Sequence, residues 1–183
     1  TSTSSPYRER IYLPYHSSNV MQLARSTNFG SAWSAVSLSP AADELGLGGD
    51  VTTDRAGTVF YAWPAYNSRT VRLRKSSDGG ASFGASSVVT TTEAAFSFAI
   101  PAQPARKVRI AVSAAADLTT GPHSDAVYLA FSDTTGPVQE DPAANHARIR
   151  VAASHDGGAS WILTTPHSTD DAATVDRFNP ALA

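Results

Sequence analysis

The sequence contains no cysteine, only two lysines and few charged residues of either sign. Without cysteine there can be no disulfide, no cysteine nucleophile and no thiolate metal site. Lys and Arg total 14 against 16 Asp and Glu, which gives a net charge of -2. A protein that grips nucleic acid by its phosphates needs clustered Lys and Arg, so we expect no nucleic-acid partner.

Long apolar runs are also missing. No stretch approaches the roughly 18 apolar residues of a membrane-spanning helix, and residues 1–6 lack both an initiating Met and an apolar signal core. The sequence predicts no membrane span and is typical of a processed or recombinant soluble piece. Ser and Thr, 23 and 18 of the 183 residues, supply the polarity that charges usually supply. We expect a secreted or periplasmic protein.

An eight-residue pattern, which we call the box, occurs three times. Residues 76–83 read Ser-Ser-Asp-Gly-Gly-Ala-Ser-Phe, and residues 154–161 repeat this as Ser-His-Asp-Gly-Gly-Ala-Ser-Trp. A weaker copy at 26–33 has Asn28 for Asp and ends in Trp33. Self-similarity at such spacing indicates a repeat architecture rather than a single irregular domain.

Short stretches rich in β-branched and aromatic residues surround each box and predict strands. No window of ten or more residues has a convincing helical period, so the fold class is all-β. The expected strands are Ile11–Tyr15, Met21–Arg25 and Ala35–Leu38 in the first unit, Asp50–Thr53, Val59–Trp63, Val71–Lys75 and Ser87–Thr90 in the second, Arg106–Val112, Val127–Phe131, Ile149–Ala153 and Trp161–Thr164 in the third, and Arg177–Leu182 at the end.

Each box falls between two expected strands, where a tight turn needs residues that tolerate positive φ. The Asp or Asn side chain and the leading Ser hydroxyl can accept hydrogen bonds from backbone N–H groups further along the turn. The closing Phe or Trp can pack against the sheet. We therefore predict a structural role for the box residues Ser76, Asp78, Gly80, Phe83, Ser154, Asp156, Gly158, Trp161, Asn28, Gly30 and Trp33.

The pattern Ser-x-Asp-x-Gly-x-Ser-Trp resembles the Asp-box of bacterial neuraminidase repeats. That resemblance implies a sialidase-like β-propeller, in which the box joins the third and fourth strands of a four-stranded blade on the lower rim. The chain then holds blade A at 8–39, blade B at 48–92, blade C at 104–166 and the first strand of another blade at 175–183. The resemblance therefore implies that residues 1–183 form a partial propeller.

A sialidase-like ring has six blades, about twice what this chain supplies. Unpaired strand edges are prone to aggregation. We therefore expect a second polypeptide chain to complete the ring, either the other product of a nicked propeller or a second copy in a homodimer.

The upper face, opposite the boxes, collects the loops that we expect to carry function. Asp50 and Asp176 each stand at the entry to an innermost strand and are candidate catalytic carboxylates. The candidates for substrate binding are Arg177, Tyr66, Asp141 and His146, the last two within an insertion between residues 132 and 146. A local charge pair or turn cap is the alternative role for Asp176 and Arg177.

The resemblance implies a sialidase-like glycoside hydrolase acting on glycan. A sialidase has Phe/Tyr-Arg-Ile-Pro near its start, whereas residues 7–11 read Tyr-Arg-Glu-Arg-Ile, so no role transfers to Arg8. The alternatives are a non-catalytic propeller that binds glycan or protein, and a polysaccharide lyase on the same scaffold. Whether the chain is an enzyme stays open at this point.

The sequence predicts no metal site and no cofactor. The five His residues lack the spacing of a zinc motif. Asp170, Asp171 and Asp176 offer carboxylates that could hold a structural calcium, but their spacing is not that of an EF-hand loop.

Overall fold

The computed structural model describes residues 5–167 and 174–183. Within them the chain forms strands and a single short 3-10 turn, in agreement with the all-β prediction. The elements are β1 (Ile11–Ser17), β2 (Val20–Ser26), β3 (Ser34–Ser37), β4 (Asp50–Thr53), β5 (Val59–Ala65), β6 (Thr70–Ser76), β7 (Ser87–Thr91), β8 (Ser97–Ile100), β9 (Gln103–Arg109), β10 (Val112–Ala116), β11 (Val127–Thr134), η1 (Pro142–Ala144), β12 (Ala147–Ser154) and β13 (Ile162–Thr164).

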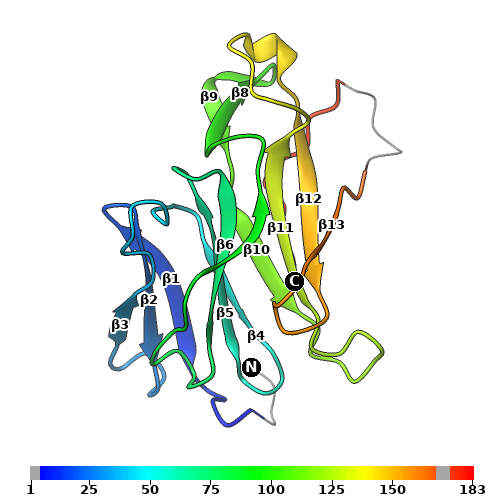
Figure 1. Cartoon of the computed structure of the whole chain (residues 1–183). Coiled ribbons are helices and arrows are strands. Elements are labelled where there is room, and N and C mark those ends of the chain that lie inside the picture. The colour runs from blue at the N-terminus through cyan, green and yellow to red at the C-terminus, as the bar shows by residue number, and fades with distance from the viewer. Residues whose placement is uncertain (1–4, 168–173) are drawn as a thin grey trace.

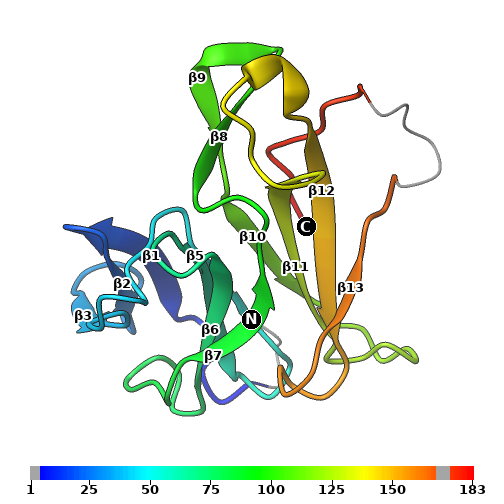
Figure 2. The same cartoon turned by 45° about the horizontal axis from the view of Figure 1, so that its top comes forward.

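Three antiparallel meanders account for most of these strands. Their strand orders are β1-β2-β3, β4-β5-β6-β7 and β10-β11-β12-β13. A separate hairpin, β8-β9, follows the second sheet and precedes the third along the chain. Figure 1 shows the three sheets side by side, and the turned view in Figure 2 shows that they splay apart. The described residues form no closed ring.

The sheets are held together by their apolar faces. All seven residues of β5 are buried, as expected for a strand covered on both sides. Trp63 and Tyr61 from this strand pack with Met21 and Leu23 of the first sheet. Phe60 from the same strand packs in a second cluster with Phe131 and other residues of the third sheet. One central strand therefore contributes to both cores, because its side chains alternate between the two faces.

The second and third sheets also meet along their first strands, β4 and β10. The backbone N–H of Val112 donates to the carbonyl of Gly48 at 3.0 Å, and Ala114 N–H donates to the Asp50 carboxylate at 2.9 Å. These contacts fix the order of the units around a common inner edge. By contrast, β1 is at the edge of its sheet and carries exposed Leu13, Ile11 and Tyr15.

The predicted first strand of the third unit, Arg106–Val112, is wrong. Residues 103–109 instead pair with 97–100 as the hairpin β8-β9, and the strand that pairs with β11 is Val112–Ala116. Residues 106–109 do lie in a strand, but alternation specifies neither where that strand ends nor which strand it pairs with. Val112–Ala116 was overlooked because its small residues, Ser113 and three alanines, give little pattern.

The expected strand at Arg177–Leu182 is also absent from the described residues. The segment 175–183 has no strand assignment, although it runs along the third sheet. Arg177 N–H donates to the Ala147 carbonyl at 2.9 Å, Asn179 N–H to the Ser132 hydroxyl at 3.1 Å and Leu182 N–H to the Ser113 hydroxyl at 3.0 Å. Two of these three acceptors are side chains, so no backbone ladder forms.

The loops lie at two opposite ends of the sheets. In the view of Figure 1 the β1-β2, β5-β6 and β11-β12 turns lie at the upper end and the three boxes at the lower end. The segments that connect one sheet to the next also lie at the upper end. Gly46, between β3 and β4, donates its N–H to the Asn19 carbonyl in the β1-β2 turn at 2.8 Å. Thr92, between β7 and β8, donates its N–H to the Arg69 carbonyl in the β5-β6 turn at 2.9 Å. The blade bounds and the blade number stay predictions, but the expected upper-face loops do gather at one end.

Candidate functional site

The three boxes share one hydrogen-bonding scheme. In the second box the buried Ser76 hydroxyl donates to Asp78 Oδ1 at 2.7 Å and accepts from Gly80 N–H at 2.8 Å. Asp78 Oδ1 also accepts from the N–H groups of Ala81 and Ser82 at 2.8 and 3.0 Å. The third box repeats each contact with Ser154 and Asp156, and the first repeats the Ser26 hydroxyl contacts with Asn28 in place of Asp.

Backbone conformation explains the glycines of the box. Its fourth and fifth residues have positive φ, +69° and +81° at Gly79 and Gly80, and +67° and +79° at Gly157 and Gly158. In the first box Phe29 takes the strained fourth position at +56°. Phe83 and Trp161 pack against the cores, whereas Trp33 is 46% exposed and donates to the Gly30 carbonyl.

Hydrogen bonds lower the pKa of both box carboxyls. For Asp78 the largest cause is the hydrogen bond from the Ser82 hydroxyl, and for Asp156 that from the Ser160 hydroxyl. Each pKa is held well below the ordinary value for Asp, so both groups stay ionised at neutral pH. Ionised carboxylates whose oxygens are already occupied by turn donors are unsuited to act as general acids.

We expect acid to weaken the fold through these two groups. Because the folded pKa is depressed, the stabilisation is complete above the unfolded pKa of about 4 and is lost as the pH falls below it. Urea unfolding between pH 6 and pH 3 should show a shallower loss of stability for the double variant Asp78→Asn/Asp156→Asn. Asn28 in the first box indicates that Asn fits this turn. Equal pH slopes for both proteins would contradict the assignment.

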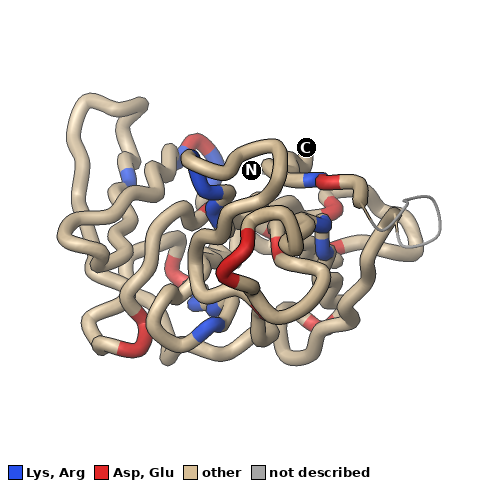
Figure 3. The backbone as a smooth tube through the Cα atoms, turned by 90° about the horizontal axis from the view of Figure 1, so that it is seen from above, with Lys and Arg blue, Asp and Glu red and all other residues tan. Residues whose placement is uncertain are grey.

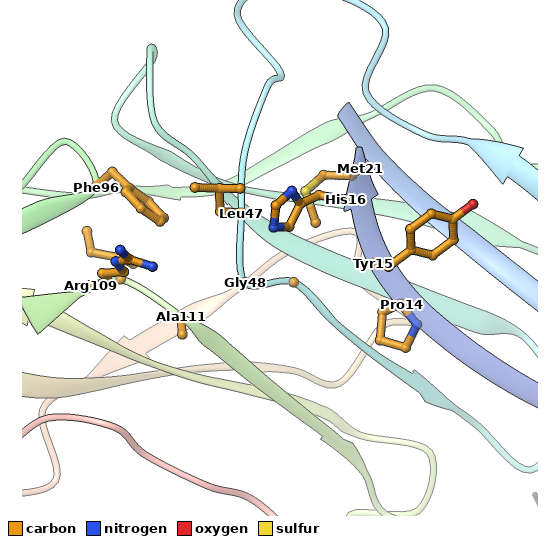
Figure 4. A pocket seen from close by; sticks show the side chains of 11 residues that line it. Pro14, Tyr15, His16, Met21, Leu47, Gly48, Phe96, Arg109 and Ala111 are labelled. Atoms are coloured by element: carbon orange, nitrogen blue, oxygen red, sulfur yellow. The ribbon is translucent and has the colours of Figure 1, made fainter. Parts of the chain in front are cut away.

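A pocket of about 420 Å³ opens at the upper end between the first sheet and the segment 109–111 at the end of the β8-β9 hairpin, and we call it the mouth pocket. Its volume is in the range of small-molecule sites. Figure 4 shows Phe96 and Arg109 on one side, His16 and Met21 on the other, and Gly48 between them. The lining residues are Pro14, Tyr15, His16, Met21, Leu47, Gly48, Gly49, Phe96, Arg109, Ile110 and Ala111.

The chemistry of the mouth pocket is mainly apolar, with one guanidinium and one imidazole. Arg109 provides the guanidinium, and the His16 ring provides a second nitrogen donor or acceptor. The lining contains aromatic rings and open glycine backbone but no Asp or Glu. Such a pocket can hold a small ligand that has an apolar face and an anionic or polar group, and it carries no carboxylate of its own for acid–base chemistry.

Asp50, a candidate catalytic residue, connects strands and does not line the mouth pocket. Its two oxygens accept from Val51 N–H at 2.8 Å and Ala114 N–H at 2.9 Å. The nearby Tyr61 hydroxyl is no activated nucleophile, because burial raises its pKa and the Asp50 charge raises it further. Asp50 therefore joins β4 to β10, a geometry that supports the scaffold beneath the pocket.

Asp176 and His146 are brought together, with Asp176 Oδ1 3.3 Å from His146 Nδ1. The same oxygen accepts from Ala147 N–H at 2.7 Å, so Asp176 anchors the start of β12. Arg177 follows on the same segment, where its backbone N–H donates to Ala147. None of the three lines the mouth pocket, although His146 lines a smaller cavity of about 210 Å³ formed by the β11-β12 loop.

The other two predicted binding residues lie elsewhere on the upper end. Tyr66 packs edge-on against Phe96, with ring centroids 6.3 Å apart, and thereby supports a wall of the mouth pocket. Asp141 is exposed and caps the turn η1, where it accepts from Ala143 N–H at 2.9 Å. His146, Asp176 and Arg177 therefore lie together at the start of β12, but the six predicted upper-face residues do not form one cluster.

Sequence reasoning missed the buried Asp133 at the end of β11. Its carboxylate accepts from the N–H groups of Glu93 and Ala94 at 3.0 and 3.1 Å and from Arg150 at 3.2 Å. The side chain is fully buried, so it joins the β7-β8 connection to the third sheet. The sequence feature that could have indicated this residue is the position of Asp133 near the end of β11, directly after a run of mostly apolar residues.

A second missed network surrounds Glu44, whose side chain is 12% exposed. Its two oxygens accept from Arg72 at 3.2 Å and Arg74 at 3.1 Å, and Ser86 donates to it as well. Asp43 pairs with Arg72 from the solvent side, with its own side chain 64% exposed. This network joins the β3-β4 connection to the second sheet, as Asp133 does one unit later.

Charged residues are sparse over the rest of the chain, and Figure 3 shows both signs as short, separated segments of the backbone. Among the described residues, no three His, Asp or Glu side chains gather closely enough to hold a metal ion. Asp170 and Asp171, two of the three carboxylates considered for calcium, lie outside the described residues. The part of the chain that is described also has no helix long and apolar enough to cross a membrane.

Comparison with known proteins adds little at the level of sequence. No family model matches the chain, and no curated protein matches it. Among solved structures, the chain is similar to the intramolecular trans-sialidase from Ruminococcus gnavus in complex with oseltamivir carboxylate. The two are 13% identical with a TM-score of 0.38, and the match covers 92% of this chain and 42% of the other. The chain thus spans less than half the length of this distant neighbour.

Proposed function

We propose that this chain is part of a sialidase-like Asp-box β-propeller that binds an anionic sugar in the mouth pocket. The three boxes with one shared turn geometry support the propeller assignment. The observation that carries the function is the pocket itself, where Arg109 faces aromatic and apolar residues at the upper end. A carboxylate sugar presents an anionic group to a guanidinium and its C–H surface to such walls.

The exposed edge strand β1 supports the proposal that further blades complete the ring. Ile11 and Leu13, 42% and 52% exposed, alternate along this strand on the side away from Tyr12, which packs on the core. Further blades in a second chain, or in a second copy of this one, would cover this face and pair with the free edge. A glycan ligand would place the assembled protein outside the cytoplasm.

Binding is better supported than glycoside hydrolysis by the described residues. Hydrolysis of a glycoside needs a proton donor and a nucleophile or base at the scissile bond. Asp50 and Asp176 are both engaged with backbone donors, and neither lines the mouth pocket. We therefore propose a sugar-binding face and assign no catalytic residue within the described chain.

Replacing Arg109 with Gln is expected to weaken binding of N-acetylneuraminic acid by about 10- to 100-fold, because a charged hydrogen bond contributes roughly 1.5–3 kcal/mol. NMR titration of the purified chain suits the weak affinities of monosaccharides. Galactose, which lacks the carboxylate, should bind equally weakly to both proteins. Arg8→Gln, which removes an exposed cation from the N-terminal segment, is the matched control.

Two outcomes would overturn this proposal. One is unchanged affinity of the Arg109→Gln variant, and the other is the absence of any shift for residues that line the mouth pocket. Release of product from a fluorogenic sialoside, abolished by Asp50→Asn or Asp176→Asn but not by Arg8→Gln, would replace it with the hydrolase hypothesis.

A further inference from the structure

A second cavity of about 560 Å³ lies along β9, and we call it the β9 groove. Its lining includes Arg106, Lys107 and Arg109, with Ser97 and Gln103 as the other polar side chains. Three of the chain's 14 Lys and Arg residues therefore fall within four positions of one strand. In Figure 1 the β8-β9 hairpin stands at the upper end, beside the loop that contains η1.

The hairpin turns Phe98 and Val108 toward the core and Lys107 and Arg109 away from it, whereas the exposed Arg106 alternates onto the side of Val108. Ser97 pairs with Arg109, and Phe98 pairs with Val108. Phe98 and Val108 are 1% and 3% exposed and pack in the large core cluster. Since side chains alternate along a strand, burial of this pair turns Lys107 and Arg109 outward. The core thus holds the cations in place on a rigid element.

The cations of the β9 groove differ from most others in the molecule. Arg72, Arg74 and Arg150 each form an ion pair with a carboxylate. Within residues 5–167 and 174–183, the side chains of Arg106, Lys107 and Arg109 form no ion pair and no hydrogen bond, and all three residues are exposed. Their charge is therefore available to an anionic ligand.

Arg109 lines both the mouth pocket and the β9 groove. We propose that the two form one continuous cleft for an acidic polysaccharide, with one sugar in the mouth pocket and the following anionic residues along Lys107 and Arg106. This inference rests on the proposed function and adds to it the ligand class, a chain of uronate or sulfated sugars in place of a single terminal acid. Carboxylate and sulfate share the recognition chemistry, namely an anion held by guanidinium and ammonium groups.

Two other roles for these cations are less consistent with the molecule. Nucleic acid is disfavoured because three cations on a chain of net charge -2 are few for a phosphate track. Lys and Arg on an exposed strand can also serve to prevent edge-to-edge pairing. That role does not require Arg109 to line two cavities at once, as it does here.

The test compares four proteins, namely wild type, Arg106→Gln/Lys107→Gln, Arg109→Gln and the control Arg8→Gln. Each is titrated with polygalacturonate, dextran sulfate, neutral dextran and N-acetylneuraminic acid at two salt concentrations. The double variant should bind at least one acidic polymer about tenfold more weakly, with no change for the monosaccharide. Arg109→Gln should lose affinity for both kinds of ligand, and the wild-type affinity for the polymer should fall with salt.

The titrations distinguish failure of the extended-cleft proposal from failure of the proposed sugar-binding function. If the double variant binds both acidic polymers as wild type does, the extended cleft is wrong, whatever the monosaccharide does. If only the monosaccharide fails to bind, the proposed function is wrong. Equal affinity for a single-stranded oligothymidylate would overturn the glycan assignment, and self-association of the double variant with unchanged polymer binding would assign the cations to edge protection.

Discussion

Replacing Asp133 with Ala is expected to lower the free energy of unfolding by about 3–5 kcal/mol, the range for breaking a buried charge pair from one side. The carboxylate is fully buried and accepts from Arg150 and from the backbone N–H groups of Glu93 and Ala94. Its removal leaves a guanidinium whose Nε is already without a partner, together with unsatisfied backbone donors. Urea unfolding followed by tryptophan fluorescence measures the loss.

Asp43→Ala is the matched control for this substitution. Asp43 also pairs with an arginine, Arg72, at 2.8 Å, but its side chain is 64% exposed. A surface pair of this kind contributes at most about 1 kcal/mol. Asp133→Asn should fall between the two, since one side-chain oxygen can still accept from the backbone. Equal losses for Asp43→Ala and Asp133→Ala would show that Asp133 does not connect the units as we describe.

The strands of the first two units could be predicted from the sequence because local pattern and tertiary environment agree there. Val59–Ala65 is apolar throughout and is buried throughout, and the boxes mark the turns that follow β2 and β6. The third unit failed at its first strand because Arg106–Val112 alternates more clearly than Val112–Ala116. Alternation of apolar and polar residues indicates that a segment is an extended strand, whereas the choice of partner strand depends on contacts with residues far along the chain.

The candidate site was less predictable for a related reason. The sequence predicts catalytic roles for Asp50 and Asp176 from their place before expected strands, but both carboxylates instead accept from backbone N–H groups, of Ala114 in β10 and of Ala147 at the start of β12. The sequence does not indicate a binding role for Arg109, because it lies within the expected strand Arg106–Val112 and not in an expected loop. Its exposure follows from the pairing of β9 with β8 and from the packing of Phe98 and Val108, which no local pattern reveals.

Replacing Gly158 with Ala is expected to destabilise the fold by about 3 kcal/mol, through two separate effects. The φ of +79° costs a residue with a Cβ roughly 1–2 kcal/mol. A Cβ at this position would also lie 2.9 Å from Leu73 Cδ2 and 3.6 Å from Phe60 Cε1, two core residues of the second sheet. Overpacking of this kind typically costs about 1–3 kcal/mol.

Gly157 provides the control that separates these effects. Its φ of +67° is similar, but a Cβ there would meet nothing within 4 Å. Gly157→Ala should therefore show only the backbone cost, and the difference between the variants measures how tightly the third box packs on the second sheet. A large difference means that the box joins two units as well as closing its own turn. Equal destabilisation would instead make the box a local turn, and adjacent units would then be held together by the Asp133 and Glu44 networks, the contacts between β4 and β10, and the shared core.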